Sequence, residues 1–553
     1  MKTLKVIREP REILTIPLTL ERTVKNHPNS IAMQILSPAG WKKWTYNELL
    51  NLTIKRANEI KSKGIKKGDR IAIYGPNSPE WVTTYLAIQW VGGIGVPLDN
   101  RLSLRMVHYL VNDSEAKLLF TTPDVANEIK DISILMDIPE KITESEVLEK
   151  EDISLDDTAV ILYTSGTTGA PKGVVLTHKN LMSNVEMCYQ TMEFYHDEPF
   201  YALLPFHHVF PQTINLLAPI SCGGTIAIAR SYKSNEIKED CQKCKPVIFP
   251  IVPLVLEKFV VGIERELKKL GGLKKVAFGL INGLGKTFNS IKKGSGGRFY
   301  KSIRETLGMD NLRYLVSGGA ALPYWVAEAL EKWGFPVIQG YGLTETSPVI
   351  SVNPPDNPRN ESVGLIMPGL EVKIIDPDID DIGEIAVRGS TVFHEFWNNP
   401  KATKEVFEGD WFKTGDMGYI DDDSYLYVSG RKKSVIVTKG GKNIYPEEIE
   451  SYLLISPLIE EVVVVQQTNE NTGVKELVAH IYPNYENIDH FGNINNISEP
   501  DPHNILTEEV KKFNEDLADY KRIRRIKLRD EEFPKTTTAK IKRYLFEEEG
   551  LEV

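Results

Sequence analysis

The chain has 553 residues, of which 41% are hydrophobic and 26% charged, and its formal net charge is −10. That length predicts several domain-sized units, and the composition is that of ordinary globular proteins, which excludes fibrous and wholly disordered chains. The acidic balance disfavours a dedicated nucleic-acid binder, whose affinity would come from neutralising phosphates. We therefore expect a folded protein that acts on small molecules and has no nucleic-acid partner.

Cysteine usage and the N-terminal segment predict a cytoplasmic location. The four cysteines, at 188, 222, 241 and 244, are too few for a disulfide framework in a chain of this length. The segment MKTLKVIREPRE lacks the apolar core of a signal peptide. Cys241 and Cys244 form a CxxC pair, but the sequence has no second such pair to complete a zinc site, so we interpret them as incidental.

Short apolar runs alternate with helix-like segments from about residue 30 to beyond residue 200, as at 70–74, 81–90 and 158–163. That alternation predicts α/β layers around a parallel sheet. Residues 262–311 are basic, glycine-interrupted and helical in period, which predicts an inserted helical excursion. From about 365 to 430, shorter strands with turn signals predict a β-rich subdomain.

The expected fold class is therefore α/β. We expect a large N-terminal α/β part of two similar subdomains plus the β-rich subdomain, and a small α+β C-terminal domain. The boundary is expected after residue 430, which gives domains at 1–430 and 431–553. Residues 484–506 are rich in Asn, Asp and Pro and lack apolar periodicity, so they are expected to form an exposed loop.

The segment YTSGTTGAPKG, residues 163–173, directly follows an apolar strand-like run. Glycines allow close backbone approach, hydroxyl groups and free amides donate to phosphate oxygens, and a lysine adds positive charge. The segment is therefore predicted to hold a phosphate. It is not the GxxxxGK[ST] loop, because Gly173 follows Lys172 where that loop has Ser or Thr. A flexible turn is the alternative, and the constrained composition after a buried strand argues against it.

Five motifs in order along the chain resemble the adenylate-forming superfamily of acyl-CoA synthetases, luciferases and peptide-synthetase adenylation domains. They are the 163–173 segment, QGYGLTET at 339–346, TGD at 414–416, GR at 430–431 and PKTTTAK at 534–540. The resemblance covers nearly the whole chain, from about 30 to 545. The 430–446 segment and the insertion at 262–311 are most similar to long-chain fatty acyl-CoA synthetases.

The resemblance implies a reaction in two halves. A carboxylate, here a fatty acid, attacks the α-phosphorus of ATP to give acyl-AMP and pyrophosphate, and the thiol of coenzyme A then displaces AMP. The co-substrates and cofactor implied are ATP, coenzyme A and Mg²⁺. The first half builds negative charge on phosphoryl oxygens, which calls for a metal ion, clustered donors and a lysine.

The catalytic residues implied by the resemblance come from three segments. Lys540 neutralises the reacting oxygens, Thr164 and Glu345 are the magnesium ligands, and Thr344 belongs to the same catalytic turn as Glu345. Ala539 departs from the glycine that the family usually has before the lysine, which restricts that loop slightly if the position needs a positive φ.

His208, in LPFHHVF, matches a gating residue near the substrate carboxylate. Adjacent side chains on an extended chain point to opposite faces, so His207 is expected to pack away from that pocket.

The implied ATP site uses an aromatic ring against adenine, here Tyr341, and an acid on the ribose hydroxyls, here Asp416. Gly318 and Gly319 match the strip that passes between adenine and the acyl group, where a side chain would collide. The full set of implied ATP-binding residues is Thr164, Ser165, Gly166, Thr167, Thr168, Gly169, Lys172, Gly318, Gly319, Gly340, Tyr341, Gly342, Thr344, Asp416 and Arg431.

The second half-reaction needs Lys540 removed and a thiol admitted, and family members swing a mobile C-terminal domain to achieve this. The hinge matches Lys433, and Gly440 and Gly441 match the loop then presented to coenzyme A. A change at a hinge is expected to alter the rate of one half-reaction more than stability.

Three alternatives stay open at this point. The first is that the acyl acceptor is a carrier protein, as in acyl-acyl carrier protein synthetases. The second is that the substrate is an aryl or shorter acid. The third is that the chain is a non-catalytic ATP- or lipid-binding protein on the same fold. The basic insertion is a candidate surface for peripheral contact with anionic membranes. Oligomeric state is not fixed by the sequence.

Overall fold

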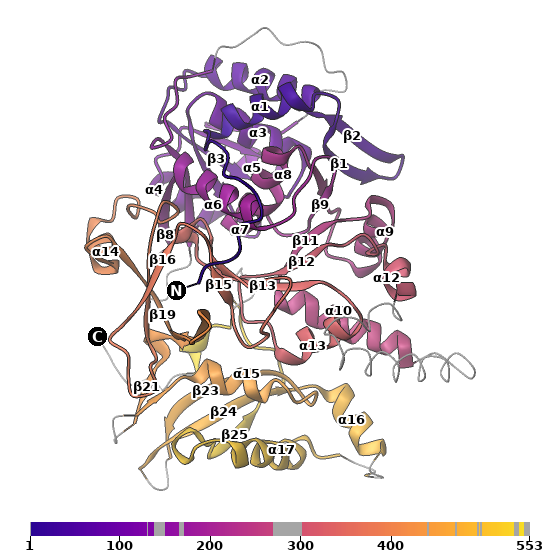
Figure 1. The fold of residues 1–553 in the computed structure, drawn as a ribbon, viewed down its shortest axis with the longest axis vertical. Helices are drawn as coiled ribbons and strands as arrows, with labels where there is room; N and C mark the ends of the chain where they lie inside the picture. The colour runs from indigo at the N-terminus through magenta and orange to yellow at the C-terminus, as the bar shows by residue number, and fades with distance from the viewer. Residues whose placement is uncertain are drawn as a thin grey trace.

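The computed structural model describes residues 2–129, 131–137, 150–164, 171–268, 301–438, 442–469, 473–494, 497, 500–535 and 541–546. Two α/β units and a run of antiparallel strands make up the larger part of the molecule, and the C-terminal residues form a separate sheet with its own helices at one end (Figure 1). The α/β fold class expected from the sequence is confirmed.

The first α/β unit contains a six-stranded sheet of order β6-β5-β3-β4-β7-β8. Its neighbouring strands are parallel except β7 and β8, which form an antiparallel pair. The strands are β3 (Arg70–Tyr74), β4 (Ile94–Leu98), β5 (Leu118–Thr121), β6 (Ser133–Leu135), β7 (Thr158–Thr164) and β8 (Lys172–Thr177). The associated helices are α2 (Tyr46–Ser62), α3 (Pro79–Trp90), α4 (Leu104–Asp113) and α5 (Pro123–Glu128).

Helix α3 is buried along nearly its whole length, because it contacts β3 and β4 of the first sheet and β1 of the second. This explains why its sequence, PEWVTTYLAIQW, has so few charges.

The second α/β unit contributes one half of a 14-stranded sheet, in the order β13-β12-β11-β9-β10-β1-β2. These strands are β1 (Ile31–Ser37), β2 (Gly40–Thr45), β9 (Pro199–Ala202), β10 (Thr225–Ile228), β11 (Ile248–Ile251), β12 (Tyr314–Ser317) and β13 (Val337–Gly342). The helices are α1 (Ile16–Asn26), α6 (His178–Thr191), α7 (Val209–Pro211), α8 (Ala218–Cys222), α9 (Ser234–Cys244), α10 (Pro253–Lys268), α12 (Lys301–Leu307) and α13 (Tyr324–Lys332), with a π-helix at Gln212–Leu217.

Antiparallel strands continue the same sheet from β13 onward, in the order β14-β15-β20-β19-β17-β16. They are β14 (Val349–Val352), β15 (Gly364–Ile366), β16 (Glu371–Ile375), β17 (Gly383–Arg388), β19 (Trp411–Ile420) and β20 (Tyr425–Arg431), with β18 (Phe407–Glu408) on β19 and helix α14 (Pro400–Val406) beside it. Short 3-10 turns occur at Thr344–Thr346 and Lys432–Ser434.

The C-terminal part has its own hydrophobic core between a three-stranded sheet and its helices. Its elements are β21 (Ile436–Val437), β22 (Asn443–Ile444), α15 (Pro446–Leu453), β23 (Ile459–Thr468), β24 (Lys475–Pro483), α16 (Tyr485–Ile494), α17 (Pro502–Asp516) and β25 (Arg525–Leu528), with 3-10 turns at Asp519–Lys521 and Arg543–Leu545.

The loop predicted at 484–506 is wrong, because helix α16 and the start of α17 occupy most of it. The polar residues that suggested a loop cap these helices instead. The Asn484 side chain accepts a hydrogen bond from the Asn487 amide at 3.0 Å, and Asp501 accepts from the His503 amide at 2.9 Å. Ile488 and Leu506 then pack into the C-terminal core.

The helical insertion expected at 262–311 lies mostly outside the described residues, which include only its two ends on α10 and α12. Its proposed contact with anionic membranes stays a prediction. Within the described part of the chain, no helix is both long and apolar enough to cross a membrane.

Candidate active site

Strands β7 and β8 hold the two ends of the predicted phosphate segment next to each other. Thr164 ends β7 and Lys172 begins β8, and the two pair across the ladder. The Thr164 hydroxyl donates to the Lys172 carbonyl at 3.5 Å, and the Lys172 ammonium lies 5.2 Å from the centre of the Phe396 ring. Ser165, Gly166, Thr167, Thr168 and Gly169 lie outside the described residues.

The base of this hairpin is tightly packed. A Cβ added at Gly173 would lie 2.8 Å from a methyl carbon of Ile161 and 3.1 Å from Cβ of Trp397, so only glycine fits there. The Trp397 amide donates to the Gly173 carbonyl at 2.7 Å, and the Tyr163 hydroxyl donates to Asp113 at 2.5 Å. These contacts fix where the phosphate segment leaves and re-enters the sheet.

The turn that carries Thr344 and Glu345 lies against β8, the strand that begins at Lys172. Its backbone is held by the Phe393 amide, which donates to the Glu345 carbonyl at 2.8 Å. At Gly342 an added Cβ would stand 1.8 Å from the Pro348 carbonyl oxygen, so a side chain there would displace the turn. The fold thus brings the predicted catalytic turn to the same strand as the predicted phosphate lysine.

Gly318 lies next to two other predicted segments, one that contains His208 and one that contains Gly340. A Cβ at this position would lie 3.3 Å from the Phe210 ring, which follows His208, and 3.7 Å from the Gly340 carbonyl oxygen. Gly319 has a φ of +86°, in the left-handed region that favours glycine, and its nearest neighbour is Val252. The glycine pair therefore lies next to the apolar side chains of Phe210 and Val252 and next to strand β13, which carries the QGYG sequence.

The two histidines lie closer together than the sequence suggested. The extended-chain argument for His207 and His208 is wrong, because the backbone turns before α7 and the two ring centroids lie 4.1 Å apart. His207 is buried, with Nε2 at 3.6 Å from Oδ2 of Asp99. Burial, and next the neighbouring His208, lower the pKa of His207 to about 3, so its ring stays neutral. His208 is half-buried at the start of α7.

The predicted adenine and ribose residues meet directly. The Tyr341 hydroxyl donates to Oδ2 of Asp416 at 2.6 Å, and Nε of Arg431 lies 2.8 Å from Oδ1. Asp416 and Arg431 face each other across β19 and β20, and Gly415 before them has a φ of +72°. Burial, followed by the Asp416 charge, raises the pKa of Tyr341 well above its ordinary value. The phenol therefore stays protonated and acts as a donor.

Glu384 is a buried acid that its sequence pattern marks only as part of a strand. Its carboxylate accepts from the Gly415 amide at 3.2 Å and from the Lys432 ammonium at 2.7 Å. It therefore ties the turn that carries Asp416 to the segment that precedes the predicted hinge. The GEI sequence around it, residues 383–385, has the alternation of an ordinary strand and gave no separate signal.

The predicted hinge residue, Lys433, is exposed on the 3-10 turn that leaves β20. The predicted coenzyme A residues Gly440 and Gly441 lie outside the described residues, and so does the predicted catalytic lysine, Lys540. The roles of these four residues therefore stay predictions.

No cluster of three or more His, Cys, Asp or Glu side chains suited to a metal ion occurs among the described residues. Cys241 and Cys244 are buried and unbonded to each other.

These features are those of an AMP-binding enzyme, and the sequence matches that family over residues 20–397. The chain belongs to this family and is an AMP-forming, adenylate-forming acid–CoA ligase. Its resemblance to the superfamily, expected from five motifs, is thereby confirmed.

Several characterised relatives are similar along most of the chain. A long-chain-fatty-acid–CoA ligase (FadD15) of Mycobacterium bovis is 30% identical over 477 residues, covering 80% of this chain and 78% of the relative. A long-chain-fatty-acid–CoA ligase of Bacillus subtilis is 28% identical over 567 residues, covering 92% and 90%. A malonate–CoA ligase of Arabidopsis thaliana is 31% identical over 441 residues, covering 74% and 67%.

Solved structures share the fold. The anthranilate CoA ligase AuaEII, in complex with anthranoyl-AMP, superposes with a TM-score of 0.76 at 22% identity, covering 97% of this chain and 96% of that one. The o-succinylbenzoate CoA synthetase of Bacillus subtilis, in complex with ATP and magnesium, has a TM-score of 0.75 at 24% identity, covering 95% and 98%.

Proposed function

We propose that this ligase is a fatty acyl-CoA synthetase that acts on long-chain acids. The observation that carries the proposal is the glycine strip at Gly318 and Gly319, which is flanked by Phe210 and Val252. An apolar wall beside the strip suits an aliphatic acyl group better than a second carboxylate such as that of malonate. The similarity to two long-chain ligases over most of the chain supports the same choice.

In the first half-reaction, the 164–172 segment would hold the β- and γ-phosphates of ATP. Thr164 and Glu345 would supply oxygen ligands to Mg²⁺, which would neutralise charge on the phosphates. Tyr341 would stack on adenine and Asp416 would bind the ribose hydroxyls, with Arg431 beside them. The turn that carries Glu345 contacts β8, the strand that begins at Lys172. This contact supports the assignment, because the proposed metal ligand then lies next to the proposed phosphate-binding segment.

Lys540 would neutralise the oxygens that gain charge as the carboxylate attacks. His208 lies two residues before Phe210 and would control access to the acyl pocket. Both assignments follow the motifs, and the His208 ring lies 4.1 Å from the ring of the buried His207.

In the second half-reaction, the chain would rotate about Lys433 and present Gly440 and Gly441 to coenzyme A. On this proposal the molecule divides into an N-terminal domain, 1–430, and a mobile C-terminal domain, 431–553. The separate core of the C-terminal part supports this division, because a part with its own buried residues can move as a unit.

The test is pyrophosphate release with ATP and Mg²⁺ across a panel of acids: acetate, malonate, benzoate, decanoate and palmitate. Each acid is assayed with and without coenzyme A. The proposal predicts the highest kcat/KM with palmitate and multiple turnovers only when coenzyme A is present. A higher value with malonate or benzoate than with palmitate contradicts the long-chain assignment and leaves the ligase class intact.

The identity of the acceptor needs a second measurement. AMP release with palmitate is compared between coenzyme A and a purified acyl carrier protein. Turnover with the carrier protein alone would replace coenzyme A by that acceptor. Absence of pyrophosphate release with every acid would instead favour a non-catalytic ATP- or lipid-binding protein.

A further inference from the structure

A cavity of about 460 Å³ lies at the edge of the second sheet that is opposite to the candidate active site. Its lining includes His27, His196 and Cys222, which precede the first residues of β1, β9 and β10. The residues of the candidate site, such as His208 and Gly318, instead follow the carboxyl ends of β9 and β12. The cavity is therefore separate from the catalytic edge, and its volume falls in the range of small-molecule sites.

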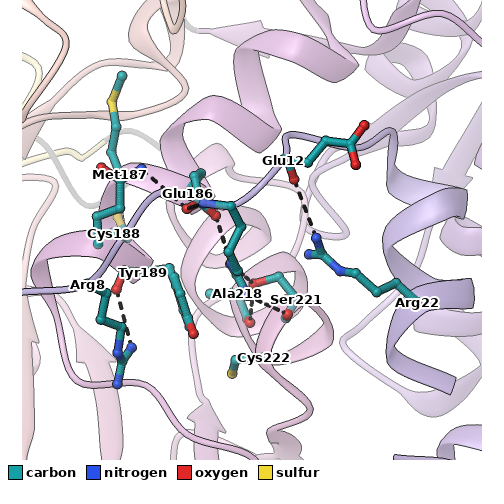
Figure 2. A network of polar contacts seen from close by, with 12 residues as sticks. Arg8, Glu12, Arg22, Glu186, Met187, Cys188, Tyr189, Ala218, Ser221 and Cys222 are labelled. Carbon is teal, nitrogen blue, oxygen red and sulfur yellow. Dashed lines mark hydrogen bonds and ion pairs between the residues drawn. The ribbon is translucent and has the colours of Figure 1, made fainter. Parts of the chain in front are cut away.

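Two arginines line this cavity, and none of the described residues that line it is acidic. Arg11 is already engaged (Figure 2). Its Nε donates to Glu186 at 2.9 Å, its Nη1 donates to the Ser221 carbonyl at 2.9 Å, and its guanidinium lies 3.3 Å from the centre of the Tyr189 ring. Arg11 is thus held in place by Glu186 and the Ser221 carbonyl.

Arg22 differs from Arg11 in its partners. Its hydrogen bond to the Glu12 carbonyl is long, at 3.4 Å (Figure 2). Among the described residues, no carboxylate forms an ion pair with it. Burial, and next the Arg11 charge, lower the pKa of the Arg22 guanidinium. The charges of Glu186 and Glu12 act in the opposite direction, but neither carboxylate forms an ion pair with Arg22. The half-buried guanidinium therefore lacks a directly bound negative partner.

Aromatic rings form the other walls of the cavity. The His27 and His196 rings stack with centroids 4.9 Å apart and planes 21° from parallel. Phe194 is buried at the back, and Tyr195, which is 47% exposed, stands at the rim. His196 also binds Asp197 at 2.8 Å. Flat rings on several sides favour a flat, polarisable ligand.

A purely structural account explains part of this cluster. Arg8 donates to the Tyr189 and Met192 carbonyls, and Arg11 donates to the Ser221 carbonyl, so both arginines satisfy carbonyl groups at the ends of α6 and α8. Arg22 has no such structural role, because it caps neither helix.

We propose that the cavity binds a nucleoside monophosphate, with the phosphate on Arg22 and the base against the Tyr195 and His196 rings. A phosphate monoester carries close to two negative charges and three acceptor oxygens, so it offers a guanidinium more charge-assisted hydrogen bonds than a carboxylate does. Because AMP is a product of the ligase reaction, occupancy of this second site would report the product level to the enzyme.

The experiment measures binding of labelled AMP to the full-length protein by equilibrium dialysis. The catalytic site is first saturated with a non-hydrolysable acyl-adenylate analogue. We expect about one further equivalent of AMP to bind, and more tightly than adenosine or inorganic phosphate alone, because the site uses both the ring and the phosphate. No further binding of AMP, or equal binding of phosphate alone, overturns the proposal.

Two variants assign the bound AMP to the cavity. Arg22→Gln is expected to weaken this binding at least tenfold, in line with the loss of a charge-assisted hydrogen bond. Lys25→Gln removes the same charge from an exposed position on α1 and is expected to leave binding unchanged. If Arg22→Gln fails to fold, Tyr195→Ala at the rim is the second test. Equal binding by the cavity variant and the Lys25 variant would contradict the assignment.

Discussion

The Tyr341 hydroxyl donates a 2.6 Å hydrogen bond to the Asp416 carboxylate, which lies 75 residues further along the chain. Arg431 binds the other carboxylate oxygen at 2.8 Å. The acid is therefore oriented by two donors before any nucleotide arrives. On the proposed assignment, Tyr341 makes two separable contributions: its ring would stack on adenine, and its hydroxyl supports the acid.

Tyr341→Phe separates these contributions, because it keeps the ring and removes the hydroxyl. We expect KM for ATP to rise by about tenfold with a smaller change in kcat, since a hydrogen bond to a charged group is lost. Tyr341→Ala should raise KM further. The measurement is pyrophosphate release as a function of ATP concentration at saturating acid.

Tyr427→Phe is the matched control. Tyr427 donates to the Asp421 carboxylate at 3.2 Å on the same sheet, so the substitution removes a similar contact away from the proposed nucleotide. Its KM for ATP should equal that of the unaltered enzyme. A larger effect at Tyr427 than at Tyr341 would remove the nucleotide role from Tyr341.

Lys540→Ala tests the lysine that the motif places at the reacting oxygens. Removing one group that stabilises developing charge should slow adenylation by roughly 10²- to 10³-fold. The second half-reaction, started from synthetic acyl-AMP and coenzyme A, should keep most of its rate, because the proposal gives the lysine no role in that step. Lys542→Ala, two residues further on, is the control and should leave both rates within about twofold of the unaltered enzyme. An unchanged rate of pyrophosphate release in Lys540→Ala would overturn the assignment.

Glu384 is predicted to support the nucleotide site through the backbone. Glu384→Ala removes the acceptor of the Gly415 amide, which frees the turn that carries Asp416, so KM for ATP should rise roughly tenfold or more. Glu384→Gln keeps an acceptor oxygen at the same place and should stay within about threefold of the unaltered enzyme. Steady-state kinetics with varied ATP check both values.

Glu371→Ala controls for the loss of an acid from this sheet. Glu371 is exposed and pairs with Arg388 on the neighbouring strand, where it contacts no predicted site residue. Its kinetics should be unchanged. If KM for ATP rises as much in Glu384→Gln as in Glu384→Ala, the ion pair between Glu384 and Lys432 contributes more to ATP binding than the hydrogen bond to the Gly415 amide does.

Local patterns were enough to predict the α/β layers, because buried strands and amphipathic helices leave a period in the sequence. They also located Thr164 and Lys172 at the ends of one loop, since that motif is continuous in sequence. Contacts between distant segments left no such trace. Arg11 and Glu186 are 175 residues apart, and nothing near either residue indicates the other.

Two local predictions failed for a related reason. The Asn, Asp and Pro content around Asn484 and Asp501 predicts a loop, although the same side chains cap helices when apolar residues such as Ile488 follow. The separation of His207 and His208 assumed extended backbone, and a turn before α7 changed the direction of both side chains. In both cases tertiary packing selected one of two locally allowed conformations.

Glu257 on α10 makes stability depend on pH. Burial, followed by the charges of Glu460 and Glu461 on β23, raises the pKa of Glu257 from 4.5 to about 7, while Lys258 and Lys535 act in the opposite direction. Between these two pH values the folded chain keeps a proton that the unfolded chain releases. Stability therefore falls as pH rises through this window, and the full cost is present above pH 7.

Glu257→Gln stays neutral and avoids this cost. Its melting temperature should exceed that of the unaltered protein at about pH 8 and approach it at about pH 5. Glu264→Gln is the control, because Glu264 is exposed on the same helix and should show no such difference. A gain at high pH in Glu257→Gln alone would show that the buried charge of Glu257 destabilises the folded chain. A parallel gain in both variants would contradict it and point to overall net charge instead.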